Sequence, residues 1–583
     1  MREWRLTEFV YREVSMLRPG ILRTAAVNLL LWLSVWGVTH AASSAAPARA
    51  LPGVQPTLAA GSLGLFPAND FRLVTGTCAD CATLKEGLWY FQDDLVAVPK
   101  PGVNSAGFSR GVAAQEDVRR WSAAAGTDEL EARPPLVWVG SPSMVVDATL
   151  QQSGAALRLA DGTVAHFAVT PKIPLNLSYY DASSATFFAR RTLRIRGTVG
   201  QNPDGKPAVT ARTIWPQDYV IDASASQLAP LGTGESLAVL VRQTDHAARY
   251  ATRVLWERSP GQPRNWDGLA ALGIMLNGAQ GDDDEAHGGH FAIMTGRLGP
   301  RGEWSDWLVN NFYNLDAFSE KGIIASMVPA DNYLMDLNSG QAYYRPSYMV
   351  VALLRSDRAA YAYQGAIARV YNHFYRHDFR YRHAGANCAG ISIDTLRTLG
   401  WRIPTRGATS YAKAAAAYPY MAAKELSFDS GKQSFDYLRE EQTRLHPAVA
   451  FDAAGNDLLQ LVGAQPQVAR AHSEYEELLK NDIAAIIFVR IPQVPSSRAT
   501  GTFPVASIDE YMQRVPADKA QWKIVPVDPR PFPSAFVSAD TEPEKRHNGA
   551  LPFSAALLLA GVLGVRAWWR RRARKAQPGP PDT

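Results

Sequence analysis

Cysteine is scarce in this sequence, and a basic domain is missing. Three Cys among 583 residues cannot form the disulfide framework of a small secreted protein. Charged residues make up 20% and apolar residues 46%, which excludes a disordered chain and a polytopic membrane protein. The net charge of +5 belongs to the ends, because residues 1–41 carry +2 and residues 566–583 carry +5, leaving −2 between them. A nucleic-acid partner is therefore excluded for the central part.

The N-terminal end has the pattern of a secretory signal peptide. A basic start leads into the apolar run Ala25 to Val38, which is short for a membrane span, and then into small residues. We expect residues 1–41 to be the signal, cleaved near Ala41 or Ala42. An uncleaved membrane anchor is the alternative.

The C-terminal end predicts a transmembrane helix over residues 550–569. This segment is apolar apart from Arg566, has the length that crosses a bilayer, and ends with Trp568 and Trp569 at the interface. The basic tail 570–583 then lies in the cytoplasm by the positive-inside rule. We expect a single-pass protein of the bacterial inner membrane whose bulk is periplasmic, although a cleaved C-terminal sorting signal has the same pattern.

The first part of the exported region is predicted to be rich in strands. Residues 42–65 are a linker without periodicity, and residues 66–245 are expected to form a β-rich domain, with a hairpin turn at Asn202–Gly205. Cys78 and Cys81 lie in this domain in a Cys-x-x-Cys arrangement. We expect them to form a disulfide, with half of a metal site and a redox pair as alternatives.

The second part, residues 265–420, is predicted to mix strands and helices, and residues 421–540 form a C-terminal extension. A helical or irregular segment is expected over 266–278, strands over 290–297 and 304–313, and helices over 356–375 and 391–399. Asn387 suits the N-cap of the last helix and places Cys388 in its first turn. A helix N-terminus lowers the pKa of a thiol and favours the thiolate. The alternative is that Cys388 is an ordinary buried residue.

Three short motifs in this part resemble a known family. Gly289-His290, Asn311-Phe312 and Asn387-Cys388 occur in the order found in the circularly permuted branch of the papain-like, NlpC-type thiol hydrolases. Within that branch they are most similar to the periplasmic domain of unknown function in the lacto-N-biosidase chaperone family. The resemblance implies an α+β fold, a permuted papain-like domain preceded by the β-rich domain, with Cys388 as nucleophile and His290 as general base.

Asn311 is the predicted third member of this site. If the hairpin turns between Pro300 and Arg301, His290 faces Asn311 across the strands, and Met294 faces Trp307. An Asn beside the base can hold the useful tautomer of the imidazole. A shift of one residue would place Asn310 there instead.

Metal chemistry is not expected. The acidic run Asp282–Glu285 with His287 and His290 could bind a metal, but acidic loops are usually solvated, and the run could instead stabilise a protonated His290. His373 and His377 have helical spacing, yet Phe374 stands where a zinc peptidase needs Glu. We therefore expect no metal and no cofactor.

The residues together predict a membrane-anchored extracytoplasmic cysteine hydrolase or acyltransferase. It would act on an amide or ester through an acyl-enzyme on Cys388, and peptidoglycan peptides or lipid-linked acyl groups are the candidate substrates. The alternative is a non-catalytic periplasmic binding or chaperone-like module on a papain-like scaffold.

Overall fold

The computed structural model describes most of the central chain. The described residues are 54–56, 62–67, 95–124, 130, 132–141, 143–170, 180–243, 249–279, 286–313, 324–337, 345–374, 378–379, 381–382, 384–466, 469–496 and 502–514. The chain divides into two units, Met1–Ala50 and Leu51–Thr583, and every described residue belongs to the second. The expected signal peptide, the Cys78 and Cys81 pair and the expected transmembrane helix lie outside the described residues. Within the described ranges, no helix has the length and apolar character needed to cross a membrane.

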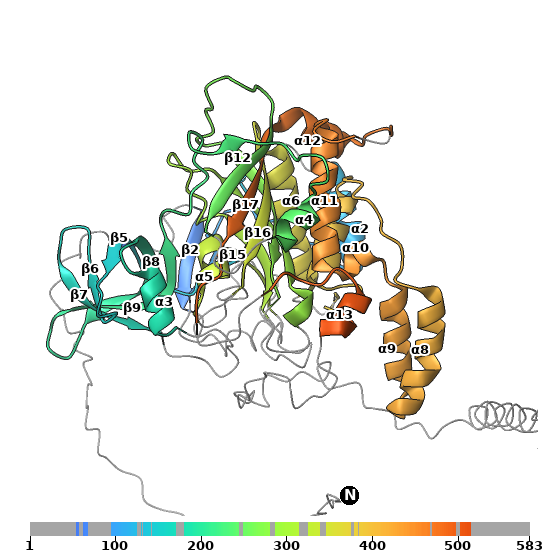
Figure 1. The fold of residues 1–583 in the computed structure, drawn as a ribbon, viewed down its shortest axis with the longest axis horizontal. Helices are drawn as coiled ribbons and strands as arrows, with labels where there is room; N and C mark the ends of the chain where they lie inside the picture. Colours follow the sequence, from blue (N-terminus) through green and yellow to red (C-terminus); the bar gives the residue numbers. More distant parts are fainter. Residues whose placement is uncertain are drawn as a thin grey trace, which may run out of the picture. The chain divides into compact units, whose positions relative to one another are not determined.

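The larger sheet contains eleven strands of the described chain and carries the expected site (Figure 1). Its order is β10-β11-β17-β16-β12-β13-β14-β15-β4-β3-β2. The bounds are β2 Leu63–Pro67, β3 Leu95–Pro99, β4 Val137–Trp138, β10 Gln227–Leu228, β11 Ala251–Glu257, β12 Ala270–Asn277, β13 His290–Arg297, β14 Leu308–Tyr313, β15 Ile324–Pro329, β16 Ser347–Leu354 and β17 Ile483–Ile491.

The central strands of this sheet explain one wrong prediction. Residues 270–277 form strand β12, whereas a helical or irregular segment was expected over 266–278. Every residue of β12 and of its neighbour β16 is buried. A strand covered on both faces has no alternation of apolar and polar residues, so its sequence resembles a buried helix. Strand β17 lies within 421–540 and pairs with both β11 and β16, so strand pairing joins the expected extension to the sheet.

A smaller barrel precedes the central strands. It contains β5 Ser143–Leu150, β6 Ala156–Arg158, β7 Val164–Val169, β8 Thr192–Gln201 and β9 Pro207–Pro216, with helix α3 Ala182–Phe188 between β7 and β8. The order β5-β6-β7-β9-β8 is closed by pairing of β8 with β5, and β1 Val54–Pro56 adds to β5. Parallel pairing of β7 with β9 makes this a Greek-key barrel of the OB type. The hairpin turn predicted at Asn202–Gly205 is confirmed by the pairing of Gln201 with Pro207.

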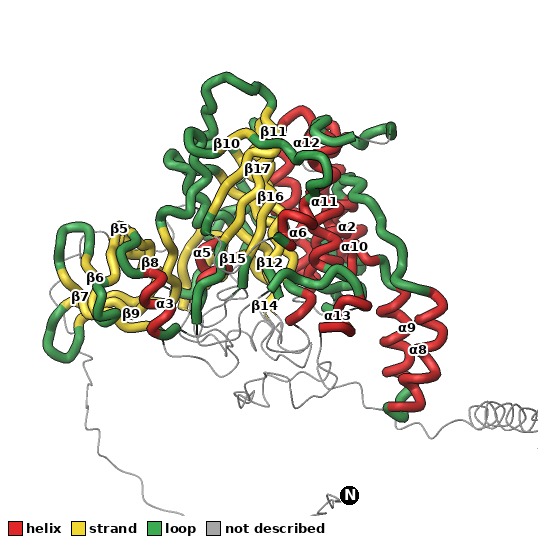
Figure 2. Tube along the Cα trace, in the orientation of Figure 1, coloured by secondary structure: helices red, strands yellow, loops and turns green. Residues whose placement is uncertain are grey.

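Helices cover the larger sheet near the expected site. Figure 2 shows α2, α6, α10 and α11 gathered along its long strands, and α6, α7 and α11 pack against β13. Besides α3, the helices of the described residues are α2 Ala114–Ala124, α4 Leu237–Arg242, α5 Ala330–Met335, α6 Arg358–Phe374, α7 Cys388–Thr398, α8 Tyr411–Lys424, α9 Phe428–Arg439, α10 Gln442–Leu445, α11 Pro447–Leu461, α12 Glu474–Asp482 and α13 Ile508–Arg514, with a 3₁₀ turn at Ala286–Gly288. The predicted strand over 290–297 is confirmed, and the helix predicted over 356–375 is present as Arg358–Phe374.

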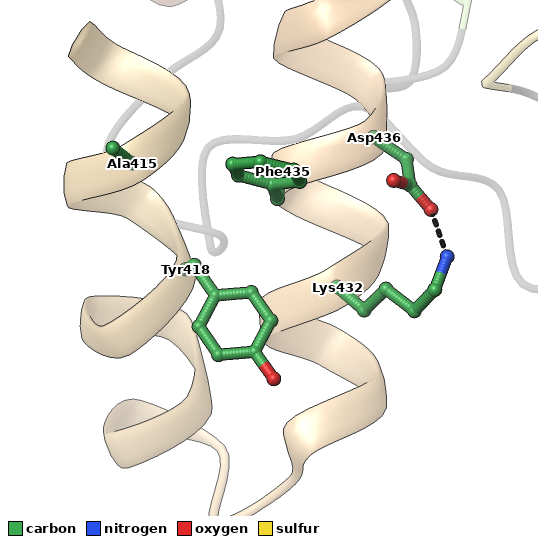
Figure 3. Close-up of a pocket in the computed structure, with 5 residues that line it drawn as sticks. All are labelled: Ala415, Tyr418, Lys432, Phe435 and Asp436. Atoms are coloured by element: carbon green, nitrogen blue, oxygen red, sulfur yellow. Dashed lines mark hydrogen bonds and ion pairs between the residues drawn. The ribbon is translucent and has the colours of Figure 1, made fainter. Parts of the chain in front are cut away.

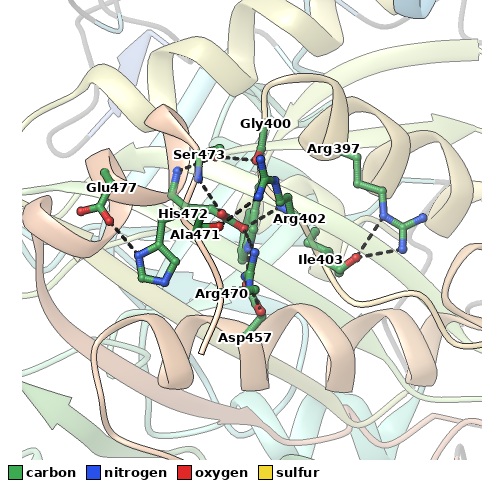
Figure 4. Close-up of polar contacts among 12 residues, drawn as sticks. Arg397, Gly400, Arg402, Ile403, Asp457, Arg470, Ala471, His472, Ser473 and Glu477 are labelled. Carbon is green, nitrogen blue, oxygen red and sulfur yellow. Dashed lines mark hydrogen bonds and ion pairs between the residues drawn. The ribbon is translucent and has the colours of Figure 1, made fainter. Parts of the chain in front are cut away.

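A polar network fixes the chain that follows α7 (Figure 4). The Trp401 Nε1 donates to Asp457 at 2.8 Å, and Arg470 pairs with Asp457 at 3.0 Å. The Ser473 hydroxyl donates to the carbonyl of Gly400 at 2.6 Å. Because α7 ends at Thr398, these contacts hold its C-terminal end against α11 and α12.

A second buried network joins α2 to α6 and makes stability depend on pH. Burial opposes ionisation of Asp117, but hydrogen bonds from Arg369, Ser109 and His373 hold its pKa at about 2. The Arg369 Nη2 lies 2.5 Å and the His373 Nε2 2.8 Å from the carboxylate. A depressed folded-state pKa stabilises the fold above the unfolded pKa, and this stabilisation is lost as the pH falls through the folded value.

We therefore expect Asp117→Asn to destabilise the protein most at neutral pH. The difference from wild type should shrink between pH 4 and pH 2, because wild type loses the contribution of its carboxylate there. Urea unfolding over a pH series measures this difference. A deficit of Asp117→Asn that stays constant from pH 7 to pH 3 would contradict the assignment.

Candidate functional site

Cys388 lies in the first turn of α7, as predicted. The Asn387 side chain accepts a hydrogen bond from the Gly390 N–H at 2.8 Å, which confirms the predicted N-cap. Its amide nitrogen donates to the Leu445 carbonyl at 3.0 Å and ties the cap to α10. A Cβ at Gly390 would lie 2.6 Å from the Gly385 carbonyl oxygen, so only glycine allows this close approach.

His290 is the first residue of strand β13, and the backbone conformation of Gly289 directs the chain into this strand. Gly289 has a φ of 70°, and a Cβ there would lie 2.5 Å from the carbonyl oxygen of Asn277. Only glycine combines this dihedral angle with this contact. His290 then pairs with Asn277, the last residue of β12.

The fold brings Cys388 next to the start of β13. Helix α7 packs on this strand, and the backbone N–H of Phe291, the residue after His290, lies near the Cys388 thiol and favours its ionised form. Asn310 fastens the same helix, since it accepts from the Ile293 N–H at 2.6 Å and donates to the Ser392 hydroxyl at 3.1 Å. Ser392 lies one turn beyond Cys388. Asn310 is thus used to position α7.

The predicted register between β13 and β14 is wrong by two residues. Met294 pairs with Val309, not with Trp307. The turn closes with the Gly299 N–H donating to the Glu303 carbonyl at 2.9 Å, which centres it on Arg301, and irregular residues follow before β14 begins. Continuing this register places Asn311 opposite Ala292, which is on the same face as His290 because side chains alternate along a strand.

Asn311 remains the neighbour of the imidazole despite the shift. Its side chain favours the protonated form of His290 and so raises the pKa of the imidazole, although neither amide atom makes a hydrogen bond of good geometry. Ser326 pairs with Asn311 across β15. Among the described residues, the His290 Nε2, both amide atoms of Asn311 and the Ser326 hydroxyl are buried without a hydrogen-bond partner. Each such group costs about 1–3 kcal/mol, so their concentration at one place needs an explanation.

Burial favours the neutral forms of both the Cys388 thiol and the His290 imidazole. Cys388 and His290 are 7% and 8% exposed. Burial raises the pKa of Cys388 to about 11, against the smaller opposite effect of N–H groups that include those of Phe291 and Ala389. Burial, with the charge of Arg345, lowers the pKa of His290 to about 3. Burial therefore works against the thiolate expected at the helix N-terminus, because its effect on the pKa is larger than that of the helix dipole.

Arg345 is a member of this site that the sequence did not predict. It is 5% exposed, and its positive charge acts on both His290 and Cys388. Tyr333 also borders the site, with its ring centre 6.1 Å from that of His290 and its hydroxyl donating to Asn277. Nothing in the local pattern around Arg345 marks it, because the carbonyl that its guanidinium reaches belongs to Gly278, which is distant in the sequence.

The residues considered for metal binding do not meet in the described chain. The acidic run Asp282–Glu285 and His377 lie outside the described residues, and His373 is bonded to Asp117. Among the described residues, no group of three or more His, Cys, Asp or Glu side chains is placed to hold a metal ion.

A pocket between α8 and α9 is separate from the predicted site residues (Figure 3). Its lining side chains are Ala415, Tyr418, Lys432, Phe435 and Asp436. Lys432 and Asp436 form an ion pair one helical turn apart. The pocket holds no thiol or imidazole, so it does not offer the chemistry predicted for Cys388 and His290.

Comparison of the chain with protein-family models, with curated proteins and with solved structures finds no match.

Proposed function

We propose that this protein is a membrane-anchored extracytoplasmic thiol hydrolase or acyltransferase that forms an acyl-enzyme on Cys388. The observation that carries the proposal is the group of buried polar atoms without partners on β13, the strand that α7 packs against, and on the neighbouring β14. The His290 Nε2 and the Asn311 amide are more than nine-tenths buried and make no good hydrogen bond among the described residues. A fold tolerates this cost where the groups serve a reaction.

The first half of the reaction starts from a neutral Cys388 thiol and a neutral His290 imidazole. The Cys388 sulfur attacks the carbonyl carbon of an amide or ester, and His290 accepts the thiol proton as the S–C bond forms. Transfer of that proton before the attack is strongly unfavourable, because the pKa of the thiol lies far above that of the imidazole. The proton therefore moves together with formation of the S–C bond. N–H groups at the start of α7 can stabilise the oxyanion.

The second half restores the resting enzyme. The tetrahedral intermediate breaks its bond to the amine or alcohol, which leaves with the proton from His290, and a thioester remains on Cys388. Water or an acceptor hydroxyl then attacks the thioester while His290 takes its proton. The acyl group leaves as an acid or a new ester, and the proton returns to the Cys388 sulfur.

A non-catalytic binding module is the second candidate. The burial of Cys388 and its raised pKa favour it, because a neutral, enclosed thiol is a poor nucleophile. In that case His290 would have no influence on the reactivity of the thiol. The two candidates therefore differ in whether the reactivity of the Cys388 thiol depends on His290.

We expect His290→Ala to slow the labelling of Cys388 by iodoacetamide at pH 7 about 100-fold. A general base contributes about 10²–10⁴ to such a step. Peptide mass spectrometry locates the label and separates Cys388 from Cys78 and Cys81. His166→Ala, on an exposed position of the barrel strand β7, is the matched control and should label like wild type. Equal labelling in all three proteins would favour the binding module.

A further inference from the structure

The helical hairpin formed by α8 and α9 buries almost none of its own side chains. Ala414 is the one buried residue of α8, and Gly431 is the one buried residue of α9. Figure 2 shows the two helices side by side, and among the described elements each packs mainly on the other. A Cβ at Gly431 would lie 2.6 Å from the Tyr418 carbonyl oxygen, so glycine allows this close approach. The packing of the two helices therefore leaves much of their apolar surface exposed.

Exposed apolar side chains gather on this hairpin, most of them near its turn. Four of the seven large apolar side chains that are exposed in the described chain lie here, namely Tyr411, Tyr420, Leu426 and Phe428. The last three are 64%, 89% and 43% exposed, and we call them the hairpin tip. A group of exposed apolar side chains at one place marks a contact with a membrane or another molecule.

Leu426 has a backbone conformation that leucine disfavours. Its φ is 52°, and the Ser427 N–H donates to the Ala422 carbonyl at 3.1 Å, the hydrogen bond that closes a Schellman motif after α8. Glycine is the usual residue at this position, because a Cβ is strained in the left-handed region. A leucine here strains the backbone and exposes apolar surface, so folding alone does not explain it.

The charges of the hairpin balance one another. Residues 411–440 contain four basic and four acidic side chains, which are Lys413, Lys424, Lys432 and Arg439, and Glu425, Asp429, Asp436 and Glu440. The Lys424 Nζ lies 5.9 Å from the centre of the Tyr420 ring. Tyrosine and lysine suit the boundary between hydrocarbon and lipid headgroups, because their stems are apolar and their ends reach water. Without net charge, a contact with lipid would depend on the apolar side chains.

The chain that leads to the expected membrane anchor leaves from beside this hairpin. Helix α13 is the last described element, and Lys413 on the first turn of α8 pairs with its Asp509 at 2.7 Å. The expected transmembrane segment starts at residue 550, which is 36 positions after Arg514. A flexible chain of that length spans about 30–36 Å on average. Helix α8 is about 21 Å long, so the bilayer is within reach of the hairpin tip.

We propose that the hairpin tip inserts into the surface of the lipid bilayer, as a second contact beside the expected transmembrane helix. This inference rests on the membrane anchorage in the proposed function and adds a surface that contacts the lipid. A protein held at two points keeps one orientation, so the domain that carries Cys388 would present a constant face to the membrane.

Photolabelling from the lipid tests this contact in the full-length protein. The protein is reconstituted into phosphatidylcholine vesicles that contain a phosphatidylcholine with a diazirine on its acyl chain, and tryptic peptides are analysed by mass spectrometry. We expect label in peptide 425–432, which contains Leu426 and Phe428, and in peptide 547–566, which covers most of the expected transmembrane helix. Replacing part of the phosphatidylcholine by phosphatidylglycerol should change neither.

Leu426→Gly separates the lipid contact from folding, because it relieves the strained backbone and removes the apolar side chain. We expect the label in peptide 425–432 to fall about tenfold, the loss that corresponds to one leucine side chain leaving hydrocarbon. The midpoint of urea unfolding should stay at or above that of wild type. Val164→Thr, which changes an exposed apolar residue on β7, is the matched control and should label like wild type.

The outcomes separate the tip contact from the anchorage. Label in peptide 547–566 without label in peptide 425–432 would overturn the tip contact alone, and label in peptide 425–432 alone would support it and contradict the transmembrane helix. Unchanged labelling of Leu426→Gly, or labelling that requires phosphatidylglycerol, would overturn the apolar insertion. A lysine-reactive crosslink between the Lys424 side chains of two chains would mean that a second copy covers the tip instead. Absence of label from both peptides would contradict both contacts.

Discussion

Cys388→Ala and His290→Ala should each abolish the burst of p-nitrophenol that the wild-type protein releases from p-nitrophenyl acetate. Wild type should release one equivalent per protein before slower turnover, because the acetyl group stays on the Cys388 sulfur as a thioester. We expect a loss of about a thousandfold or more in each variant, and little further loss in the double variant, since members of one catalytic unit are not additive. Stopped-flow absorbance measures the release of p-nitrophenol, and the mass of the acetylated peptide shows that the acetyl group is on Cys388.

Volume-matched variants keep this test independent of folding. Cys388 and His290 are 7% and 8% exposed, so alanine at either position leaves a cavity. Cys388→Ser and His290→Gln should lose the burst while keeping the unfolding temperature of wild type. Asn311→Ala should cost less, because Asn311 acts through the imidazole. A full burst from Cys388→Ala, or an acetyl group on another residue, would contradict the nucleophile assignment.

The parts of the site that local sequence determines were predictable. The N-cap at Asn387 follows from a side chain that bonds three residues ahead, so its signal lies within one turn. Strand β13 was predictable with its bounds, His290–Arg297, because turn residues lie on both sides of it. The register of β14 was not, since it depends on the conformation of residues between Gly299 and Trp307 that no alternation pattern specifies.

The remaining features depend on tertiary contacts. Strand β12 was missed because both of its faces are covered, which removes the alternation that identifies a strand. Arg345 was missed because its contact at Gly278 is 67 residues away in the sequence. The neutral state of Cys388 and His290 follows from burial, and burial is decided by α7 packing on β13 rather than by the residues around either group.

The ion pair between the barrel and α5 should have the largest effect on stability. Arg196 on β8 and Asp331 on α5 are both 0% exposed, and the Arg196 Nε lies 2.8 and 2.9 Å from the two carboxylate oxygens. The Arg196 Nη2 also donates to Asp306 at 2.6 Å. Arg194 also lies 3.3 Å from the Asp331 carboxylate, so replacing Arg196 removes one of the two cations that compensate this buried charge. Breaking a buried ion pair costs about 3–5 kcal/mol.

We therefore expect Arg196→Met to lower the free energy of unfolding by about 3–5 kcal/mol in urea titrations. Arg191→Met is the matched control, because its pair with Asp218 is 30% and 64% exposed and should contribute less than about 1 kcal/mol. In a double-mutant cycle, Asp331→Asn should add little to Arg196→Met, since both remove the same interaction.

Loss of the ion pair between Arg196 and Asp331 should also affect the candidate site. Asp331 lies two residues before Tyr333 on α5, and the Tyr333 ring centre is 6.1 Å from that of His290. A short helix that loses its ion pair cannot hold Tyr333 against the imidazole as firmly, so the His290-dependent labelling of Cys388 should fall in Arg196→Met at temperatures where the protein remains folded. If Arg196→Met unfolds at the same urea concentration as Arg191→Met, the buried pair does not stabilise the fold. If it unfolds earlier but labels like wild type, α5 does not couple the barrel to the site.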